Sequence, residues 1–174
     1  YTSLLVFIMS LYLWAAFDNS TAKFQYVEVY NWIGSSNINF YLGIDGISLF
    51  FVILTTLLIP ICILASWEAI KTNVKEYMIA FLVLEAFVIA VFCVLDLILF
   101  YVFFEAVLIP MFIIIGVYGS RERKIRAAYM FFLYTLLGSV LMLLAILWIY
   151  FHAGTTDYQI LLTTEFDEDV QKLL

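Results

Sequence analysis

The fold of this chain is decided by residues 97–118, which read LILFYVFFEAVLIPMFIIIGVY. An α-helix rises about 1.5 Å per residue, so this run is long enough to cross a hydrocarbon core about 30 Å thick. Its one charged residue, Glu105, lies near the middle of the run. The run therefore predicts a transmembrane helix with a carboxylate where lipid alone does not tolerate one.

Apolar runs before and after this segment extend the same interpretation to the whole chain. Of the 174 residues, 66% are hydrophobic, whereas soluble domains are typically about 45–50% apolar. We expect an all-α, polytopic membrane protein with a single transmembrane domain over 1–174. Its spans, about five in number, are predicted at 3–17, 44–67, 77–95, 97–118 and 127–151. The first run is short for a full crossing unless residues before Tyr1 extend it.

Residues 18–43 form a long polar stretch between the first two runs. The stretch contains tyrosine, tryptophan and phenylalanine side chains, which are enriched at membrane–water interfaces. We therefore expect an interfacial segment that packs on the membrane surface.

The basic residues are distributed unevenly between the two sides of the membrane. Five crossings place loops 68–76 and 119–126 on one side, and place segment 18–43, the turn at Asp96 and the tail on the other. Of the 8 lysines and arginines, six fall in the first two loops and only Lys23 and Lys172 fall on the second side. The positive-inside rule therefore predicts that loops 68–76 and 119–126 face the cytoplasm or the mitochondrial matrix.

Glu85 and Glu105 are the ionisable residues inside the predicted spans. Both are expected near the bilayer midplane on adjacent antiparallel helices, where water would allow them to exchange a proton. A carboxylate held in such a place can load and release protons as its surroundings change. The structural alternative is a protonated glutamate that bonds a neighbouring carbonyl and joins two helices. For Glu105 the proton-path interpretation is favoured. For Glu85 the proton-path and the structural interpretations are equally supported.

No pattern for redox or nucleophilic chemistry accompanies these glutamates. Cys62 and Cys93 have no C-x-x-C spacing, and the one histidine, His152, stands at a helix end. No metal ligands, catalytic residues or cofactor-binding residues are predicted on this chain. By itself the chain is no ordinary enzyme.

Three segments resemble subunit 4 of NADH dehydrogenase, an antiporter-like membrane subunit of respiratory complex I. They are FYLGIDGISLFFVILTTLLIPICILASW at 40–67, LDLILFYVFFEAVLIP at the start of 95–146, and GTTDYQILLTTEF at 154–166. The amino-acid sequence of these segments is similar to that of mitochondrial members of the family, such as those of plants and protists. The resemblance covers nearly the whole chain.

This resemblance implies a fold, a function and a location. The family has an antiporter-like fold with two inverted repeats, and the predicted spans resemble its second to sixth helices. Glu105 matches the family's proton-channel glutamate, and Glu85 falls on the preceding helix. The implied function is proton translocation within NADH:ubiquinone oxidoreductase of the mitochondrial inner membrane, with the basic loops in the matrix. The complex would carry FMN, iron–sulfur clusters and ubiquinone on other subunits.

The sequence also departs from the family pattern, because the later helices and their central lysine are absent. We expect partners among the membrane-arm subunits, membrane lipids, and a separate chain that carries the remaining helices; a fragment is the other explanation. Two other functions stay open. One is a subunit of a cation/proton antiporter complex, and the other is a structural remnant of the membrane arm.

Overall fold

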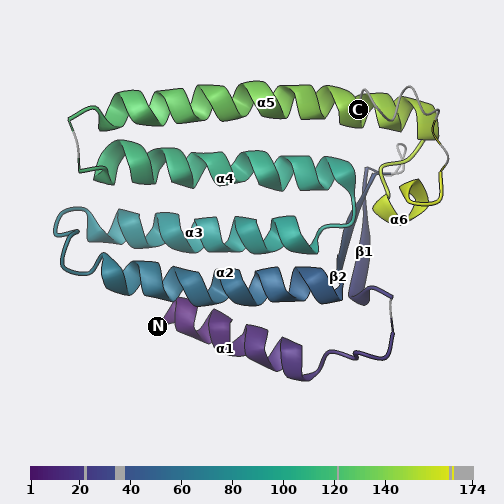
Figure 1. The fold of residues 1–174 in the computed structure, drawn as a ribbon, viewed down its shortest axis with the longest axis horizontal. Coiled ribbons are helices and arrows are strands. Elements are labelled where there is room, and N and C mark those ends of the chain that lie inside the picture. The colour runs from purple at the N-terminus through teal and green to yellow at the C-terminus, as the bar shows by residue number, and fades with distance from the viewer. Residues whose placement is uncertain (22, 34–37, 121, 165, 167–174) are drawn as a thin grey trace.

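The computed structural model describes residues 1–21, 23–33, 38–120, 122–164 and 166. Its long helices lie side by side in the order of the sequence, each packed on the one before it (Figure 1). They are α1 (Thr2–Ala15), α2 (Gly46–Ala65), α3 (Val74–Cys93), α4 (Leu97–Tyr118) and α5 (Lys124–Ala153). Within the described ranges, α2, α3, α4 and α5 are long and apolar enough to cross a membrane.

The predicted membrane fold, a row of apolar helices, is confirmed. Helix boundaries differ from the predicted runs by three residues at most, as for the run predicted at 77–95 and observed as Val74–Cys93. Helix α1 has 14 residues, which gives a rise of roughly 21 Å against a core of about 30 Å. Helix α2 continues through Pro60 and helix α4 through Pro110.

A β-hairpin, which the sequence analysis did not predict, occupies much of the polar stretch after α1. Strand β1 (Gln25–Ile33) pairs antiparallel with strand β2 (Ile38–Ile44) at one end of the helix row (Figure 1). Strand β1 reads QYVEVYNWI, and its aromatic and β-branched residues favour an extended backbone. The all-α description therefore holds for the membrane-crossing part and not for this end. Residues 22 and 34–37 of the predicted interfacial segment lie outside the described residues.

The hairpin end of the molecule is closed by hydrogen bonds between segments far apart in the sequence. The amide of Leu95 donates to the carbonyl of Tyr41, and the amide of Leu97 donates to the carbonyl of Thr156, both at 2.9 Å. Short helix α6 (Tyr158–Leu161) follows, and the amide of Tyr158 donates back to the carbonyl of Leu95. These bonds join strand β2, the α3–α4 connection and the segment after α5. Burial and the nearby Asp157 carboxylate raise the pKa of Tyr41.

Aspartates cap the helices that start at the hairpin end. Asp45 accepts a hydrogen bond from the amide of Ser48 at the start of α2. Asp96 accepts from the amides of Ile98 and Leu99 at the start of α4. A carboxylate at a helix start satisfies free amides and interacts favourably with the helix dipole. Each cap therefore lies where a helix begins and the chain enters the apolar layer.

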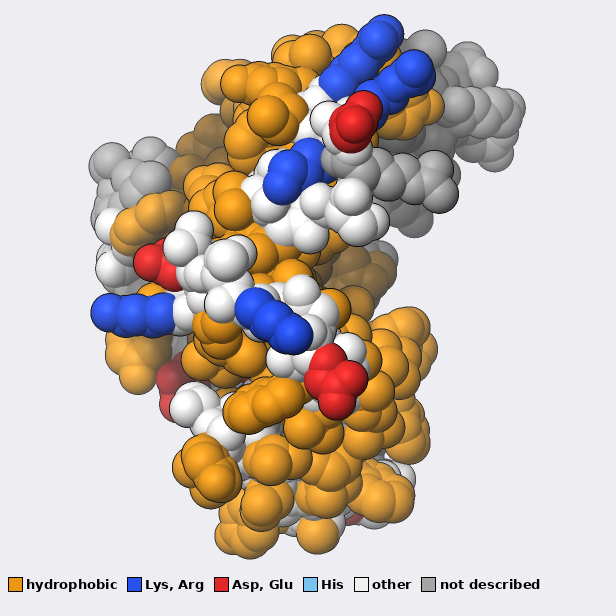
Figure 2. All heavy atoms as spheres, turned by 90° about the vertical axis from the view of Figure 1, so that its left-hand side faces the viewer, with side chains coloured by type: hydrophobic (Ala, Val, Ile, Leu, Met, Phe, Trp, Pro, Cys, Tyr) orange, Lys and Arg blue, Asp and Glu red, His pale blue; other side chains and the backbone are white. Residues whose placement is uncertain are grey.

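The opposite end of the row carries most of the basic side chains. The α2–α3 and α4–α5 loops meet there, and Figure 2 looks onto this end, where lysines and arginines stand among fewer acidic groups. The described basic residues of these loops are Lys71, Lys75, Arg123, Lys124 and Arg126. Lys23 lies two residues before strand β1, at the hairpin end. Arg121 and Lys172, which also entered the sidedness argument, lie outside the described residues.

Candidate functional site

Glu105 lies on the face of α4 that packs against α5. Phe112, two turns further along this face, contacts the rings of Tyr129 and Phe132 of α5 at centroid distances of 5.3 and 5.8 Å. A Cβ atom on Gly116, one turn beyond Phe112, would lie 3.4 Å from the Cβ atom of Ala128. Because residues about 3.6 apart share a helix face, Glu105 belongs to the α4–α5 interface.

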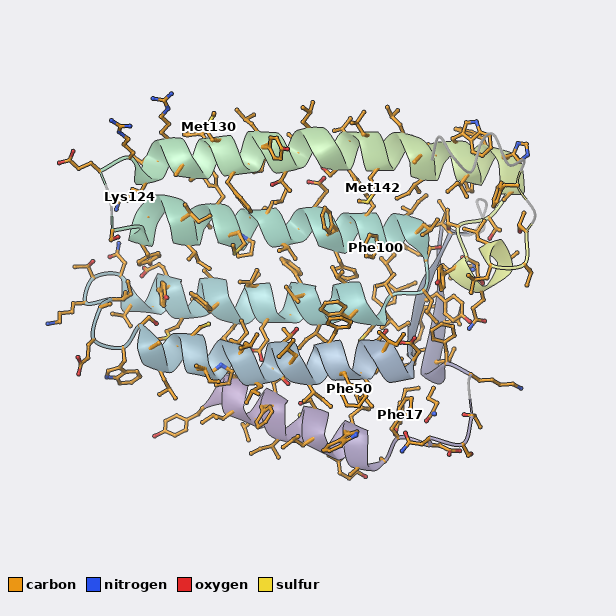
Figure 3. All side chains as sticks on the ribbon, in the orientation of Figure 1. Phe17, Phe50, Phe100, Lys124, Met130 and Met142 are labelled. Atoms are coloured by element: carbon orange, nitrogen blue, oxygen red, sulfur yellow. The ribbon has the colours of Figure 1, made fainter. Side chains whose placement is uncertain are left out.

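One hydroxyl group lies beside the Glu105 carboxylate, and a second hydroxyl group lies beside the first. Tyr101 stands one turn before Glu105 on α4, and its hydroxyl interacts with both the Glu105 carboxylate and the Ser139 hydroxyl of α5. Ser139 is buried and donates a hydrogen bond to the carbonyl of Leu136 at 3.0 Å. The side chain of Met142 lies beside this region, between α4 and α5 (Figure 3). Tyr101, Glu105 and Ser139 therefore form a small polar cluster inside an apolar interface.

Glu85 occupies a different interface, between α2 and α3. Phe92, two turns after Glu85 on the same face, stacks on Phe51 of α2 at a centroid distance of 5.1 Å. Met78, two turns before it, lines a cavity together with Ile63 of α2. The side chain of Glu85 is 2% exposed, so neither water nor lipid reaches it from outside the bundle.

The two glutamates lie at the same depth but on opposite sides of the α3–α4 pair. The rings of Phe87 and Phe103 meet between α3 and α4 at 6.3 Å. Each glutamate is two residues from one of these rings, which rotates it by about 200° around its helix and away from that contact. The structure therefore does not bring Glu85 and Glu105 together. The proton exchange through water that the sequence analysis considered would therefore have to pass the packed α3–α4 contact.

Both glutamates leave a carboxylate oxygen unsatisfied. Among the described residues, Oε1 of Glu85 and Oε1 of Glu105 are the two buried side-chain oxygen or nitrogen atoms without a hydrogen-bond partner. No lysine or arginine occurs within 77–118, which contains both glutamates. An unpartnered buried charge is costly, so each carboxyl must bind a proton or meet a donor from outside these helices.

The contacts of Tyr101 with Glu105 and Ser139 were not predicted from the sequence. The spacing of four residues between Tyr101 and Glu105 was an available signal, because such residues share a helix face. Ser139 had no comparable signal, since it comes from another helix. Among the described residues, no three histidine, cysteine, aspartate or glutamate side chains are grouped to hold a metal ion.

Comparison with protein families gives two adjoining matches. Residues 1–95 match a family described as NADH-ubiquinone oxidoreductase chain 4, amino terminus. Residues 94–173 match a transmembrane family described as NADH:quinone oxidoreductase/Mrp antiporter. The first match alone covers more than half of the chain.

Curated relatives carry the same description. The chain is 68% identical over 174 residues to NADH-ubiquinone oxidoreductase chain 4 of Marchantia polymorpha, a match that covers 100% of this chain and 35% of the relative. It is 70% identical over 172 residues to the Arabidopsis thaliana protein of that name, with coverage of 99% and 35%. The chain thus spans about a third of the length of these relatives.

Solved structures with the same fold include respiratory complex I from Thermus thermophilus with bound NADH. That match has a TM-score of 0.81 at 27% identity and covers 97% of this chain and 34% of the other. The Mrp complex from Dietzia sp. DQ12-45-1b matches with a TM-score of 0.74 at 18% identity, covering 89% and 17%. At that identity the second match shows a shared fold alone.

Proposed function

This chain belongs to the NADH-ubiquinone oxidoreductase chain 4 family, of which it corresponds to the amino-terminal part, and we propose that it contributes Glu105 to a proton path in the membrane arm of complex I. The function of the complex would be proton translocation coupled to electron transfer from NADH to ubiquinone. Redox cofactors would be held by other subunits, because this chain supplies only membrane helices and their loops to the arm.

The observation that carries this proposal is the buried, unsatisfied Oε1 atom of Glu105, whose carboxylate also interacts with the Tyr101 hydroxyl. A purely structural glutamate is expected to have both oxygens bonded, because unsatisfied buried groups destabilise a fold. A carboxylate that exchanges hydrogen-bond partners during turnover needs at least one oxygen that its own helix and the neighbouring helix leave unbonded. Glu105 would alternate between a bound proton and a salt bridge to a cation from outside these helices.

Two features supply local polarity around this carboxylate. The Tyr101 and Ser139 hydroxyls offer donors and acceptors through which a proton can be passed. Pro110 has no N–H group to bond the carbonyl of Ala106, next to Glu105, so that carbonyl is left available to water or to a donor. A short wetted segment along the α4–α5 interface is the arrangement that this chemistry requires.

The cation would come from the part of the relatives' length that these 174 residues do not cover, since residues 77–118 contain no lysine or arginine. Glu85, at the α2–α3 interface, would be a second proton-carrying group at the same depth. Because the two interfaces are separate, we propose that Glu85 takes its proton from different neighbours than Glu105 does.

We further propose that the complex is in the mitochondrial inner membrane and that loops 68–76 and 119–126 face the matrix. The described basic residues of both loops gather at one end of the helix row, as the positive-inside rule requires of the matrix side. The high identity to mitochondrial-type plant relatives supports the location. The likeness to an Mrp complex, at 18% identity, supports only the fold, so the antiporter alternative is disfavoured.

The test is the Glu105→Gln substitution in the assembled complex reconstituted into vesicles. Glutamine keeps the size and polarity of the side chain but cannot release a proton. We expect NADH-driven acidification or alkalinisation of the vesicle lumen to be lost while the membrane arm still assembles, as judged by native gel electrophoresis.

The matched control is Glu122→Gln, a change of the same kind in the exposed α4–α5 loop. This variant is expected to pump at the original rate. Undiminished pumping by the Glu105→Gln complex would remove Glu105 from the proton path and leave the structural-remnant interpretation in its place.

A further inference from the structure

An apolar groove lies between α3 and α4, in the half of these helices nearest the basic loops. Its cavity volume is about 600 Å³. Ala80 and Val83 of α3 face Ile109, Pro110 and Ile113 of α4 across it. Val83, Ile109 and Ile113 are 37%, 61% and 39% exposed, so the groove opens to the outside of the bundle.

The groove is hollow because small side chains line its base. Ala80 and Pro110 are buried and fill little of the space between the two helices. Deeper along the helices, the contact between the Phe87 and Phe103 rings closes the groove. The groove therefore has one closed end inside the apolar layer and one open end at the loops, and it is open along its outer side.

The length of the groove matches one leaflet of a bilayer. On α3 it extends from Glu76 to Phe87, a rise of roughly 16 Å at 1.5 Å per residue. Half of a hydrocarbon core about 30 Å thick is about 15 Å. An acyl chain that entered at the loops would therefore reach the closed end with its terminal carbons.

The open end of the groove presents oxygen acceptors. The Tyr118 hydroxyl donates to the carbonyl of Asn73 at 2.7 Å, and its oxygen can accept from a further donor besides the nearby Tyr77 backbone. The Glu76 carboxylate lines the same opening and interacts electrostatically with that hydroxyl. The side chain of Asn73 adds a further amide oxygen. Such an opening is complementary to a cation with several N–H donors.

The exposed Lys75 stands next to Glu76 in the sequence and supplies the opposite charge at the same end of the bundle. The ammonium of a zwitterionic head group would meet Glu76 in the groove opening, and its phosphate would lie near Lys75, which is exposed and outside the groove lining. The ammonium of ethanolamine carries three N–H donors, as a lysine side chain does, whereas the quaternary ammonium of choline carries none. Only the first can bond the carboxylate and the phenolic oxygen directly.

We propose that this groove is a phospholipid site that holds one acyl chain of phosphatidylethanolamine. The chain lies against Val83, Ile109 and Ile113, the ammonium binds Glu76 and the Tyr118 oxygen, and the phosphate faces Lys75. Bound in this way, the lipid fills the gap that α3 and α4 leave at their outer edge. The proposal does not depend on the proton path, because Glu105 is not among the residues that line the groove.

The experiment uses the assembled complex in nanodiscs of phosphatidylcholine. A small fraction of the lipid is replaced by phosphatidylethanolamine with a diazirine near the end of one acyl chain, and labelled peptides are identified by mass spectrometry after irradiation. We expect the label to concentrate on the groove segments of α3 and α4 rather than on the exposed face of α5. A phosphatidylcholine probe with the same acyl chain is expected to label the groove less.

Five variants make the test decisive. Val83→Phe fills the groove and should reduce labelling there severalfold, whereas Val83→Ala leaves it open and should retain the label. Val140→Phe makes the same change at a similarly exposed valine of α5, where 43% exposure compares with 37%, and should have no effect. Glu76→Gln should remove the preference for ethanolamine over choline, while Glu68→Gln in the neighbouring loop should not.

Three results would overturn the proposal. Equal labelling of the groove and of α5, or equal labelling by the two head groups, would mean that the lipid is not held by these residues. A photoreactive amino acid placed at residue 83 that crosslinks to another protein chain, and not to lipid, would show that the groove is a protein interface.

Discussion

Asp96 and Glu105 are both carboxylates next to long apolar runs, yet their surroundings differ completely. One oxygen of Asp96 accepts from the amides of Ile98 and Leu99, and the other accepts from the buried hydroxyl of Thr156. Oε1 of Glu105 has no hydrogen-bond partner among the described residues. A buried structural carboxylate needs hydrogen bonds to both of its oxygens, as Asp96 has. The missing bond at Glu105 is consistent with the proposed proton-carrying role.

Tyr101→Phe tests the polar cluster at the α4–α5 interface. The substitution removes only the hydroxyl that interacts with Glu105 and Ser139. A hydrogen bond to a charged group contributes about 1.5–3 kcal/mol, so we expect the pumping rate to fall roughly 10-fold to 100-fold. Its pH profile should shift as well, which a merely structural role would not cause.

The control for this measurement is Tyr134→Phe, because Tyr134 of α5 is 84% exposed. We expect this variant to pump at the original rate with an unchanged pH profile. An unchanged Tyr101→Phe complex would mean that the hydroxyl beside Glu105 takes no part in moving the proton.

Asp96→Ala tests the hydrogen bonds that Asp96 makes at the hairpin end. The change removes a helix cap and leaves the buried hydroxyl of Thr156 without its acceptor. Loss of a cap costs about 1 kcal/mol, and a buried unsatisfied group costs about 1–3 kcal/mol more. We expect the free energy of unfolding in detergent to fall by roughly 2–4 kcal/mol, measured by denaturant titration.

Asp45→Ala provides the comparison, since Asp45 caps α2 but is only half-buried and makes one such bond. Its expected cost is about 1 kcal/mol. Equal losses for the two variants would show that the bond between Asp96 and Thr156 contributes nothing to stability.

At the scale of elements, the α4–α5 turn brings two long helices together through one small residue. A Cβ atom on Gly119 would lie 2.5 Å from the carbonyl oxygen of Ile115 and 2.8 Å from the Cβ atom of Lys124. The first neighbour is backbone and cannot move without shifting α4. The position of α5 against Glu105 therefore depends on a glycine at this turn.

Gly119→Ala is expected to displace α5 and to reduce the free energy of unfolding by about 1–3 kcal/mol, as overpacking usually does. Gly138→Ala is the matched change inside α5, where a Cβ atom meets nothing within 4 Å. Alanine there should stabilise the helix by about 0.5–1 kcal/mol. Denaturant titration of both variants measures the difference, and a stable Gly119→Ala protein would contradict the close approach.

At the scale of the whole molecule, the helices form a row with two unlike ends. The hairpin and α6 gather at one end, and the described basic loop residues gather at the other (Figures 1 and 2). Each helix packs mainly on its sequence neighbours, so large apolar faces remain exposed, most extensively on α5. In a membrane these faces meet lipid or further helices.

Sidedness is tested with single cysteines in a background in which Cys62 and Cys93 are replaced by serine. We expect Lys71→Cys and Arg126→Cys to react with a membrane-impermeant maleimide only from the matrix side, because both lie at the basic end. Lys23→Cys should react only from the opposite side. The readout is labelling in intact mitoplasts against inverted inner-membrane vesicles. Lys71→Cys and Lys23→Cys labelled from the same side would refute the arrangement.

The sequence by itself determined the position of the long apolar helices and the family, and it predicted the depth of the two glutamates. Within lipid a backbone must satisfy its own hydrogen bonds, so apolar runs such as 97–118 become helices whatever surrounds them. Depth follows from the constant rise of the helix, which is why Glu85 and Glu105 were expected level with each other.

Only the tertiary structure decided which interface each side chain enters. Glu85 faces α2 and Glu105 faces α5, because the Phe87–Phe103 contact turns both away from the α3–α4 interface. Neither this rotation nor the bond between Asp96 and Thr156, 60 residues apart, leaves a trace in hydropathy. Such contacts depend on the shapes that meet when helices pack, and shape complementarity between distant segments is a property of the assembled fold.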